Sequence, residues 1–336
     1  MEKRLILAGD IGGSKSRLAL YDSKQHLRKE TTYTNADFLD FPAIINDFLA
    51  PESLPPARAC LGVAGPVHNN RVTLTNLGWH IDGKQLSEST GITEVFLVND
   101  LVATAAGLWQ LTPEKRITLN RGRPQPDGTM AVIAPGTGLG QAYVVTQDGI
   151  KLPLPSEGGH SSFAPRNRQQ LDLLAFMLQH KKHVSVEQVC SGLAIPHLFA
   201  FISQTIPPPA WLTKKIQKAN DPTPVIVQAA CKAINGKNIS CETAVNTLHL
   251  FIDILAAESA NLALKVLASG GIFIGGGLPP RIVDFFDPAR FMMIFCRGTF
   301  QNMLANIPVY LILDPKTALP GALALAVARN KASYQI

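Results

Sequence analysis

The sequence predicts an α/β protein built from two halves that begin alike. Its 336 residues favour two domains, because a domain holds roughly 100 to 200 residues. Short apolar segments of strand length alternate with segments of helical periodicity. Glycine-rich turns at Gly12-Gly13 and Gly136-Thr137-Gly138 each join two predicted strands. These observations indicate a duplicated architecture in which each half opens with a strand, a glycine turn and a second strand.

The composition excludes a disordered chain and argues against a nucleic-acid partner. Hydrophobic residues make up 46% of the chain and charged residues 17%, which suits a buried core. The net charge of +6 comes from scattered Lys and Arg residues, without the tract of about five to eight basic residues that marks a binding segment. The five cysteines form no C-x-x-C pair, so neither a disulfide framework nor a zinc knuckle is expected. We therefore expect a cytoplasmic protein.

Neither a signal peptide nor a membrane segment is expected. The first apolar run, Leu5 to Ala8, is too short for the core of a signal peptide. The longest apolar region, Phe251 to Leu278, contains Asp253, Glu258 and Lys265. Because a membrane span carries few or no charges, this region predicts a buried helix followed by a strand.

In the first half, strands alternate with helices. Apolar runs and period-two patterns predict strands at Arg4 to Asp10, Ser16 to Tyr21, Leu27 to Tyr33, Arg58 to Val63, Arg71 to Leu74 and Glu94 to Val98. Helical periodicity predicts helices at Asp37 to Leu49, Lys84 to Ser89 and Leu101 to Leu108. The segment Thr112 to Asp127, with its prolines and basic residues, predicts a link into the second half.

The second half adds many helices to a similar beginning. Its predicted strands are Met130 to Ala134, Leu139 to Val145, Ile150 to Leu154, Gly271 to Ile274 and Val309 to Leu313. Its predicted helices are Gln169 to Gln179, Val186 to Ser191, Ala194 to Thr205, Thr223 to Ile234, Cys241 to Leu267 and Leu319 to Asn330. Three prolines at Pro207 to Pro209 break the helical stretch. The last helix, rich in alanine and leucine, is expected to fold back on the N-terminal half.

Asp10 ends the first predicted strand and is followed by the turn Gly12-Gly13-Ser14. Glycines let backbone N–H groups approach an anion closely. A carboxylate beside such an anion indicates a bridging cation such as Mg²⁺. The alternative is an ordinary glycine hairpin with a solvated Asp10.

A second glycine loop strengthens the case for a phosphate ligand. Gly136-Thr137-Gly138 joins two strands in the second half and offers unhindered N–H groups with a hydroxyl. Two such loops in matching halves favour a polyphosphate, and therefore a nucleotide. A third turn, Gly275-Gly276-Gly277, leaves room for a planar base, although it also suits a tight strand-to-helix connection.

Polar residues after buried strands are the candidate substrate ligands. Asn99 and Asp100 precede a helix, where open α/β sheets present ligand-binding groups; Asp100 also suits a helix N-cap, whereas capping gives Asn99 no role. Glu157 and His160 share a loop that lacks further metal ligands, which favours a polyhydroxylated ligand or ordinary surface polarity over zinc. Glu187 is expected in the first turn of the short predicted helix Val186 to Ser191, where a carboxylate suits the helix dipole.

Taken in order along nearly the whole chain, these motifs resemble those of the bacterial glucokinases, in the proteobacterial group of the hexokinase/actin-like ATPase superfamily. The motifs are Asp10-Ile-Gly-Gly-Ser14, Ala64-Gly-Pro-Val67, Thr75-Asn-Leu-Gly-Trp79, Val98-Asn-Asp100, Gly136-Thr-Gly-Leu-Gly140, Glu157-Gly-Gly-His160, His183-Val-Ser-Val-Glu187 and Gly275-Gly-Gly277. The cysteine-rich zinc motif of the related repressor/open-reading-frame/kinase group is absent, since the first cysteine after His160 is Cys190. The sequence therefore resembles the zinc-free group.

The resemblance implies an actin-like ATPase fold, which is related to ribonuclease H. A cleft is expected between a smaller N-terminal domain, residues 1–110 plus 316–336, and a larger helix-rich domain, residues 111–315. The implied activity is ATP-dependent phosphorylation of glucose to glucose 6-phosphate, with ATP and Mg²⁺ as cofactors. A cytoplasmic homodimer is also implied.

The resemblance further implies a role for each matching residue. Asp100 is the expected general base for the sugar 6-hydroxyl. The residues expected to hold the sugar are Asn99, Asp100, Glu157, His160 and Glu187. Those expected at the ATP phosphates are Asp10, Gly12, Gly13, Ser14, Gly136, Thr137 and Gly138. Asp10 is expected to hold Mg²⁺ through water, and adenosine is expected at Gly276 and Gly277.

Two positions depart from the family pattern, and both concern the nucleotide. The usual Gly-Gly-Thr-Asn ends in Ser14-Lys15, and the usual Ser-Gly-x-Gly ends in Ala194. Competing functions are a kinase for another hexose, and a sugar sensor or actin-like ATPase that has lost transfer; intact Asp10 and Asp100 argue against the latter. No helix-turn-helix extension precedes Arg4, which argues against a DNA-binding repressor.

Overall fold

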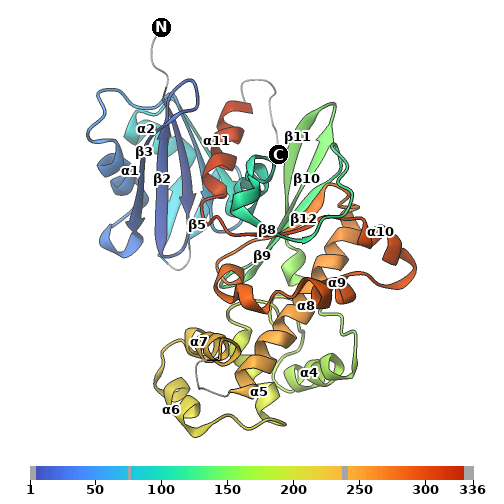
Figure 1. Cartoon of the computed structure of the whole chain (residues 1–336). Helices are drawn as coiled ribbons and strands as arrows, with labels where there is room; N and C mark the ends of the chain where they lie inside the picture. The colour runs from blue at the N-terminus through green and yellow to red at the C-terminus, as the bar shows by residue number, and fades with distance from the viewer. Residues whose placement is uncertain (1–4, 75–76, 237–240, 329–336) are drawn as a thin grey trace. The chain divides into compact units, whose positions relative to one another are not determined.

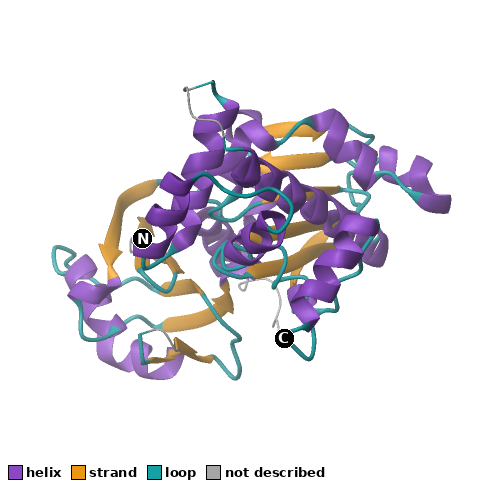
Figure 2. Ribbon diagram, turned by 90° about the horizontal axis from the view of Figure 1, so that it is seen from below, coloured by secondary structure: helices purple, strands orange, loops and turns teal. Residues whose placement is uncertain are grey.

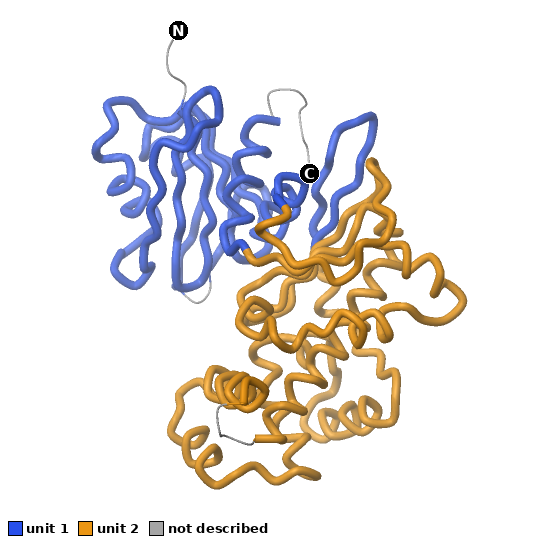
Figure 3. The backbone as a smooth tube through the Cα atoms, in the orientation of Figure 1, with its two compact units in different colours: residues 1–112, 142–155, 314–336 blue, residues 113–141, 156–313 orange. Residues whose placement is uncertain are grey.

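The structure is a computed structural model that describes residues 5–74, 77–236 and 241–328. The chain forms two compact units, which Figure 3 colours separately. The first comprises Met1–Thr112, Ala142–Pro155 and Asp314–Ile336, and the second comprises Pro113–Gln141 and Ser156–Leu313. Each unit combines strands with helices (Figure 2), in agreement with the α/β class expected from the sequence. The segment Ala142–Pro155, which the sequence-based division kept in the larger domain, is grouped with the first unit.

The first unit contains a five-stranded sheet in the order β3-β2-β1-β4-β7. Its strands are β1 (Ile6–Ile11), β2 (Lys15–Tyr21), β3 (Leu27–Thr34), β4 (Arg58–Val63) and β7 (Glu94–Asn99). β2 runs antiparallel to both β1 and β3, whereas β1, β4 and β7 are parallel. A separate antiparallel pair consists of β5 (Arg71–Leu74) and β6 (Trp79–Asp82). The parallel strands β1 and β7 therefore end at the same edge of the sheet.

Helices cover both faces of this sheet. They are α1 (Phe41–Leu49), α2 (Gly83–Thr90), α3 (Asp100–Gly107) and α11 (Ala318–Ala328), with short 3₁₀ turns η1 (Asn35–Asp37) and η2 (Leu108–Gln110). Alternate residues of β1 face different cores, because Leu7 packs in the cluster that contains α1 and Ala8 packs in the cluster that contains α3 and α11. Complete burial of such apolar side chains stabilises the fold by roughly 1.5 to 3 kcal/mol each for the larger ones.

The C-terminal helix α11 packs against α3 in the first unit, as expected (Figure 1). Gly321 permits this contact, since a Cβ there would collide with the carbonyl oxygen of Ala103. Gly107 has the same function on α3, where a Cβ would collide with the carbonyl oxygen of Thr317. Of the predicted helix Leu319 to Asn330, the last two positions lie outside the described residues.

A second sheet has the order β11-β10-β9-β12-β13-β8 and supplies the strands of the second unit, except that the part of β10 and β11 within Ala142–Pro155 is grouped with the first unit. Its strands are β8 (Arg116–Asn120), β9 (Met130–Pro135), β10 (Leu139–Gln147), β11 (Ile150–Ser156), β12 (Gly271–Ile274) and β13 (Val309–Ile312). β9, β12 and β13 are parallel, and β8 pairs antiparallel with β13. When only the strands of each sheet are counted and β8 is set aside, both sheets place their third, second, first, fourth and fifth strands side by side. This shared order supports the duplicated architecture that the glycine turns indicated.

Helices make up the rest of the second unit. They are α4 (Arg168–Leu178), α5 (Ile195–Ser203), α6 (Ala210–Lys218), α7 (Pro222–Ile234), α8 (Glu242–Val266), α9 (Pro288–Phe295) and α10 (Gln301–Ala305), with 3₁₀ turns η3 (Pro113–Lys115), η4 (Gly158–His160), η5 (Pro279–Phe285) and η6 (Gly298–Phe300). The long helix α8 contacts α5, α7 and α9 (Figure 1). It is long and apolar enough to cross a membrane, but 78% of its apolar window is buried in the structure, so it is a core helix.

Some sequence predictions of secondary structure were wrong. The expected link Thr112 to Asp127 contains β8, and α6, α9, α10 and β6 were not predicted. The expected helix Val186 to Ser191 is instead a series of turns, in which Gln188 N–H donates to Ser185 and Cys190 N–H donates to Glu187. Ser185 also pairs with Ser162 in an isolated β-bridge, which ties the start of this segment to a neighbouring chain segment and competes with helix formation.

Candidate active site

Two carboxylates lie at the shared edge of the first sheet. Asp10 is near the end of β1, and Asp100 follows β7 as the first residue of α3. The intervening strand β4 presents Gly62 between them, because Gly62 pairs with Asp10 on one side and Val98 on the other. A Cβ at Gly62 would collide with the side chain of Ala103 in α3. The glycine therefore allows α3, and with it Asp100, to lie close to the sheet.

Burial sets the protonation chemistry of both carboxylates. Burial raises the pKa of Asp10, while the guanidinium of Arg17, with Nη1 at 3.7 Å from Oδ2, lowers it. Burial, together with the negative charge of Asp10, raises the pKa of Asp100 to about 6, against the hydrogen bond from Leu101 N–H at 2.9 Å. Asp100 is thus ionised at neutral pH, yet it accepts a proton more readily than an ordinary aspartate.

Asn99 caps helix α3, contrary to the expectation that capping gives it no role. Its Oδ1 accepts from Leu101 N–H at 2.9 Å. Its Nδ2 donates to the carbonyl oxygen of Gly65 at 3.1 Å, which connects it to the Ala64-Gly-Pro-Val67 motif. Asp100 is therefore the first helical residue and not the N-cap, so its position needs a different explanation.

The turn after Asp10 is held open by a buried asparagine. Gly12 N–H donates to Lys15 O at 2.9 Å and closes the turn. Asn35, which is fully buried, donates from its backbone to Ser14 O at 3.0 Å and from Nδ2 to Gly12 O at 2.8 Å. Within the described part of the chain, no acceptor receives the N–H groups of Gly13 or Ser14. These groups are available for an anion.

In the second unit, Glu157, His160 and Glu187 form a polar cluster. His160 Nε2 lies 3.8 Å from Glu157 Oε2, and His160 Nδ1 lies 3.9 Å from Glu187 Oε1. The backbone N–H of Glu187 donates to Gly159 O at 2.9 Å, which fixes the two segments side by side. Because the side chains of Glu157 and His160 are 75% and 63% exposed, the cluster can reach a ligand with several hydroxyl groups.

Glu187 also supports the glycine loop Gly136-Thr137-Gly138. Its Oε2 accepts from Leu139 N–H at 2.8 Å, and a Cβ at Gly138 would collide with its carboxylate. Gly192 N–H donates to Gly136 O at 2.7 Å. The polar cluster and the glycine loop are therefore direct neighbours, which sequence separation did not reveal.

The turn Gly275-Gly276-Gly277 lies against the end of β9. Gly276 has a φ of +87°, and a Cβ there would meet the carbonyl group of Pro135. A Cβ at Gly277 or Gly136 would have no atom within 4 Å, so the backbone is open at both positions. Ala194 has a right-handed helical backbone with φ of −77°, which alanine adopts without strain.

Sequence reasoning missed a buried polar network beside the cluster. Glu258 is only 3% exposed and accepts from Gln141 Nε2 at 3.0 Å and Asn261 Nδ2 at 2.8 Å. Gln141 in turn packs so closely on Gly158 that a Cβ there would collide with Gln141 Oε1. The available signal was the position of Glu258 within an otherwise apolar helix, since an unpaired carboxylate is rarely buried there.

Among the described residues, no three His, Cys, Asp or Glu side chains gather as in a protein-only metal site. A lone carboxylate such as Asp10 instead suits hydrated Mg²⁺, which keeps most of its water ligands. In the motif that ends at Trp79, Thr75 and Asn76 lie outside the described residues, and the indole of Trp79 donates to Leu39 O at 3.0 Å.

Comparison with known proteins matches the whole chain to one family. The glucokinase family model matches residues 7–329. A glucokinase from Nostoc sp. (strain PCC 7120) is 37% identical over 346 residues, covering 97% of this chain and 99% of the relative. The crystal structure of a glucokinase from an Antarctic psychrotroph has a TM-score of 0.83 and 31% identity, covering 97% of this chain and 99% of that one.

A more distant structure shares the fold. A ROK family glucokinase from Streptomyces griseus, in complex with glucose and AMPPNP, has a TM-score of 0.64 at 20% identity and covers 96% of this chain. The expected actin-like ATPase fold is confirmed. The chain therefore belongs to the glucokinase family and phosphorylates glucose with ATP.

Proposed function

We propose that Asp100 is the general base of glucose phosphorylation. Its carboxylate accepts the proton of the sugar 6-hydroxyl while that oxygen attacks the γ-phosphorus of ATP, and ADP leaves. The observation that supports this role is the pKa of about 6, which burial and the charge of Asp10 produce. A base with this pKa is ionised at neutral pH and gains driving force for proton transfer.

Asn99, Glu157, His160 and Glu187 are proposed to hold the sugar together with Asp100. Carboxylates accept hydrogen bonds from adjacent hydroxyl groups, whereas asparagine and histidine offer donors and acceptors. Asn99 already uses Oδ1 for Leu101 and Nδ2 for Gly65, and its side chain also hydrogen-bonds to Asp100, so the second lone pair of Oδ1 is left for the sugar. Its cap therefore fixes the orientation of the amide before glucose binds.

The glycine turns are proposed to bind the nucleotide. Gly12, Gly13, Ser14, Gly136, Thr137 and Gly138 would contact the phosphates, and Gly276 with Gly277 would face adenosine. Support comes from the free N–H groups of Gly13 and Ser14 and from the open backbone at Gly136 and Gly277. Asp10 would hold hydrated Mg²⁺, which supplies neutralisation of phosphate charge.

The family resemblance also supports three proposals beyond the site residues. The active form is a homodimer, the enzyme acts in the cytoplasm, and residues 1–110 plus 316–336 form the smaller domain. None of the five cysteines, all of which lie among the described residues, forms a disulfide, which agrees with a reducing compartment. Mass measurement by light scattering at several concentrations tests the dimer, and a mass of one chain throughout would exclude it.

Coupled detection of ADP tests the proposed chemistry with a matched sugar pair. Glucose should support turnover in the presence of ATP and Mg²⁺. The sugar 6-deoxyglucose lacks only the reacting oxygen, so it should compete with glucose and release no ADP. Equal ADP release with both sugars, or without sugar, would show water as the acceptor and remove the sugar 6-hydroxyl from the reaction.

A further inference from the structure

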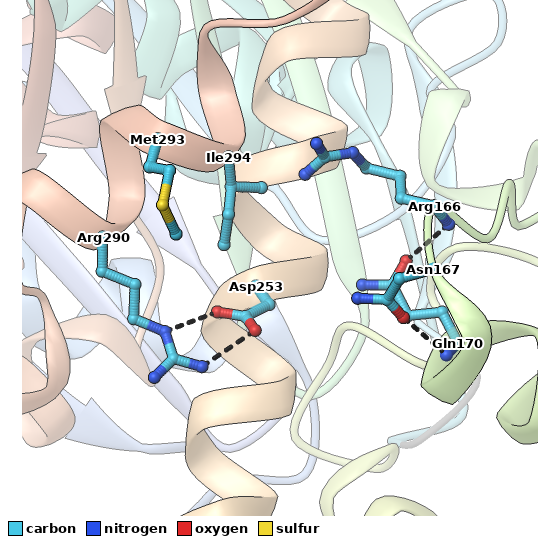
Figure 4. Close-up of a pocket in the computed structure, with 7 residues that line it drawn as sticks. All are labelled: Arg166, Asn167, Gln170, Asp253, Arg290, Met293 and Ile294. Atoms are coloured by element: carbon cyan, nitrogen blue, oxygen red, sulfur yellow. Dashed lines mark hydrogen bonds and ion pairs between the residues drawn. The ribbon is translucent and has the colours of Figure 1, made fainter.

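A cavity of about 350 Å³ lies in the second unit, and none of the residues proposed above lines it (Figure 4). Residues that precede and begin α4 form one wall, and residues of α8 and α9 form the other. This volume is near the lower end of the roughly 300 to 1,000 Å³ typical of small-molecule sites. The cavity is therefore large enough for a small metabolite.

Two amide side chains present their N–H groups to this cavity. Asn167 Oδ1 accepts from Gln170 N–H at 2.9 Å and caps α4, and Gln170 Oε1 accepts from Arg166 N–H at 2.9 Å. Because backbone donors occupy both amide oxygens, each nitrogen must point the other way, toward Asp253 (Figure 4). Gln170 is 1% exposed, and none of the described residues accepts from its Nε2. The Nε2 atom itself is not one of the buried side-chain atoms that lack a partner, so it reaches the open space of the cavity and can donate to a ligand there.

The charges around the cavity favour an anion. Arg290 is neutralised by Asp253 through two hydrogen bonds, from Nε at 2.8 Å and Nη2 at 2.9 Å. The guanidinium of Arg166 lies beside the cavity (Figure 4), and among the described side chains none pairs with it. Burial and the charge of Arg166 lower the pKa of Arg297, while the charge of Glu258 raises it, so a second guanidinium lies nearby and has Glu258 as its counter-charge. One uncompensated positive charge therefore faces the space.

The opposite wall suits the carbon part of such a ligand. Met293 and Ile294 of α9 line the cavity, and Met293 is 72% exposed. The start of α4 adds the partial positive charge of a helix N-terminus to the guanidinium and the two amides. This combination of a planar cation with several N–H donors matches the oxygens of a phosphate group.

We propose that this cavity is a second binding site, which takes a small phosphate-bearing metabolite. Arg166 and the amides of Asn167 and Gln170 hold its phosphate, and Met293 with Ile294 contacts its carbon skeleton. The Arg290–Asp253 pair closes the far wall and leaves Arg166 as the charge that selects an anion.

Titration calorimetry with inorganic phosphate tests the proposal on the whole enzyme. Saturating glucose and AMPPNP fill the substrate and γ-phosphate positions, and potassium chloride at equal ionic strength controls for screening. The wild type should bind one phosphate. Arg166→Gln should weaken that binding at least about tenfold, since it removes a charge-assisted hydrogen bond.

Two further variants separate the site from general charge and from folding. Arg168→Gln is the matched control, because Arg168 is 87% exposed and pairs with Asp172 outside the cavity; it should bind phosphate like the wild type. Asn167→Asp keeps the capping oxygen of α4 but turns a donor into a carboxylate, and it should abolish phosphate binding without loss of helix stability. Turnover without phosphate should be unchanged in all three variants.

Three outcomes would overturn the proposal. The first is no saturable phosphate binding by the wild type beyond the chloride control. The second is wild-type affinity in both Arg166→Gln and Asn167→Asp. The third is equal weakening by Arg166→Gln and Arg168→Gln, which would show a diffuse surface field in place of a site.

Discussion

Replacement of Asp100 by asparagine tests both the proposed base and its electrostatic cost. Asparagine has the same size, and its Oδ1 can still accept from Leu101 N–H, so α3 should begin at the same residue. An amide oxygen does not take up a proton at neutral pH. Phosphoryl transfer should therefore fall by about 10² or more, while glucose binding is retained.

The same substitution should stabilise the protein at neutral pH. The pKa of Asp100 rises from 3.8 to about 6 in the folded state, chiefly through burial. At about 1.4 kcal/mol per pH unit, this rise means that the ionised Asp100 carboxylate lowers the free energy of unfolding by about 3 kcal/mol. A raised folded pKa means that the folded protein binds the proton more tightly than the unfolded chain. The penalty is absent below about pH 4, grows up to about pH 6 and is complete at pH 7.

Asp82→Asn is the matched control in the same unit. Asp82 is the N-cap of α2, and asparagine caps equally well. Its pKa is lowered, first by the hydrogen bond from Arg71, so its charge stabilises the fold. Asp82→Asn should therefore leave turnover intact and give no gain in stability at pH 7.

Three measurements on each variant test the role of Asp100 as the base and the electrostatic cost of its charge. Urea unfolding at pH 7 and pH 4 gives the free energy of unfolding, coupled ADP release gives turnover, and calorimetry gives glucose affinity. The free energy of unfolding of Asp100→Asn should exceed that of the wild type by up to about 3 kcal/mol at pH 7 and by little at pH 4. Near-normal turnover would remove Asp100 as the base, and unchanged or lower stability at pH 7 would refute the electrostatic account.

Other predictions concern the same groups. In the wild type, kcat/KM should fall about tenfold from pH 7 to pH 5, because Asp100 loses its basic form around its pKa of about 6; a flat profile would exclude it. Glu187→Gln keeps an acceptor for Leu139 N–H but removes the charge beside His160, so KM for glucose should rise about tenfold with unchanged urea stability, and an unchanged KM would exclude a sugar contact. Gly138→Ala should displace the Glu187 carboxylate and raise KM for both substrates in steady-state kinetics, whereas normal values for both would contradict the packing argument.

The sequence was sufficient for elements whose signal is local. The bounds of β4, β5 and β12 agree with the predicted ones to the residue, because each is a short run ended by a turn or polar segment. β8 was taken for a link because the prolines and basic residues of the surrounding segment hide its pairing. That pairing depends on β13, far along the chain, where Arg116 stacks over the ring of Tyr310 at 4.0 Å. Such a partner has no local signal.

Short helices that begin at prolines were missed for a related reason. Proline suggested an interruption, yet it is favourable in the first turn of a helix, where no backbone N–H is needed. α9 begins with Pro288 behind the N-cap Asp287, and α6 begins directly after Pro209. A capping aspartate before proline was the signal for α9.

For the site, residue types could be predicted but their interactions could not. The motifs singled out Asn99, Asp100 and Glu187 as candidates. The cap that Asn99 provides and the contact of Glu187 with the glycine loop depend on neighbours from other elements. The same holds for the pKa of Asp100, since Asp10 approaches it only because β1 and β7 share a sheet edge.

The position of Gly62 links the fold to this electrostatic arrangement. A larger residue there would collide with Ala103 and push α3 outward, so Asp100 would gain water and move away from Asp10. Both changes would return its pKa toward the ordinary value and make it a weaker base. The close packing that destabilises the ionised carboxylate is thus the same packing that suits it to accept a proton. Gly62, on the strand between Asp10 and Asp100, therefore lowers the stability of the protein through the same packing that favours the proposed catalysis.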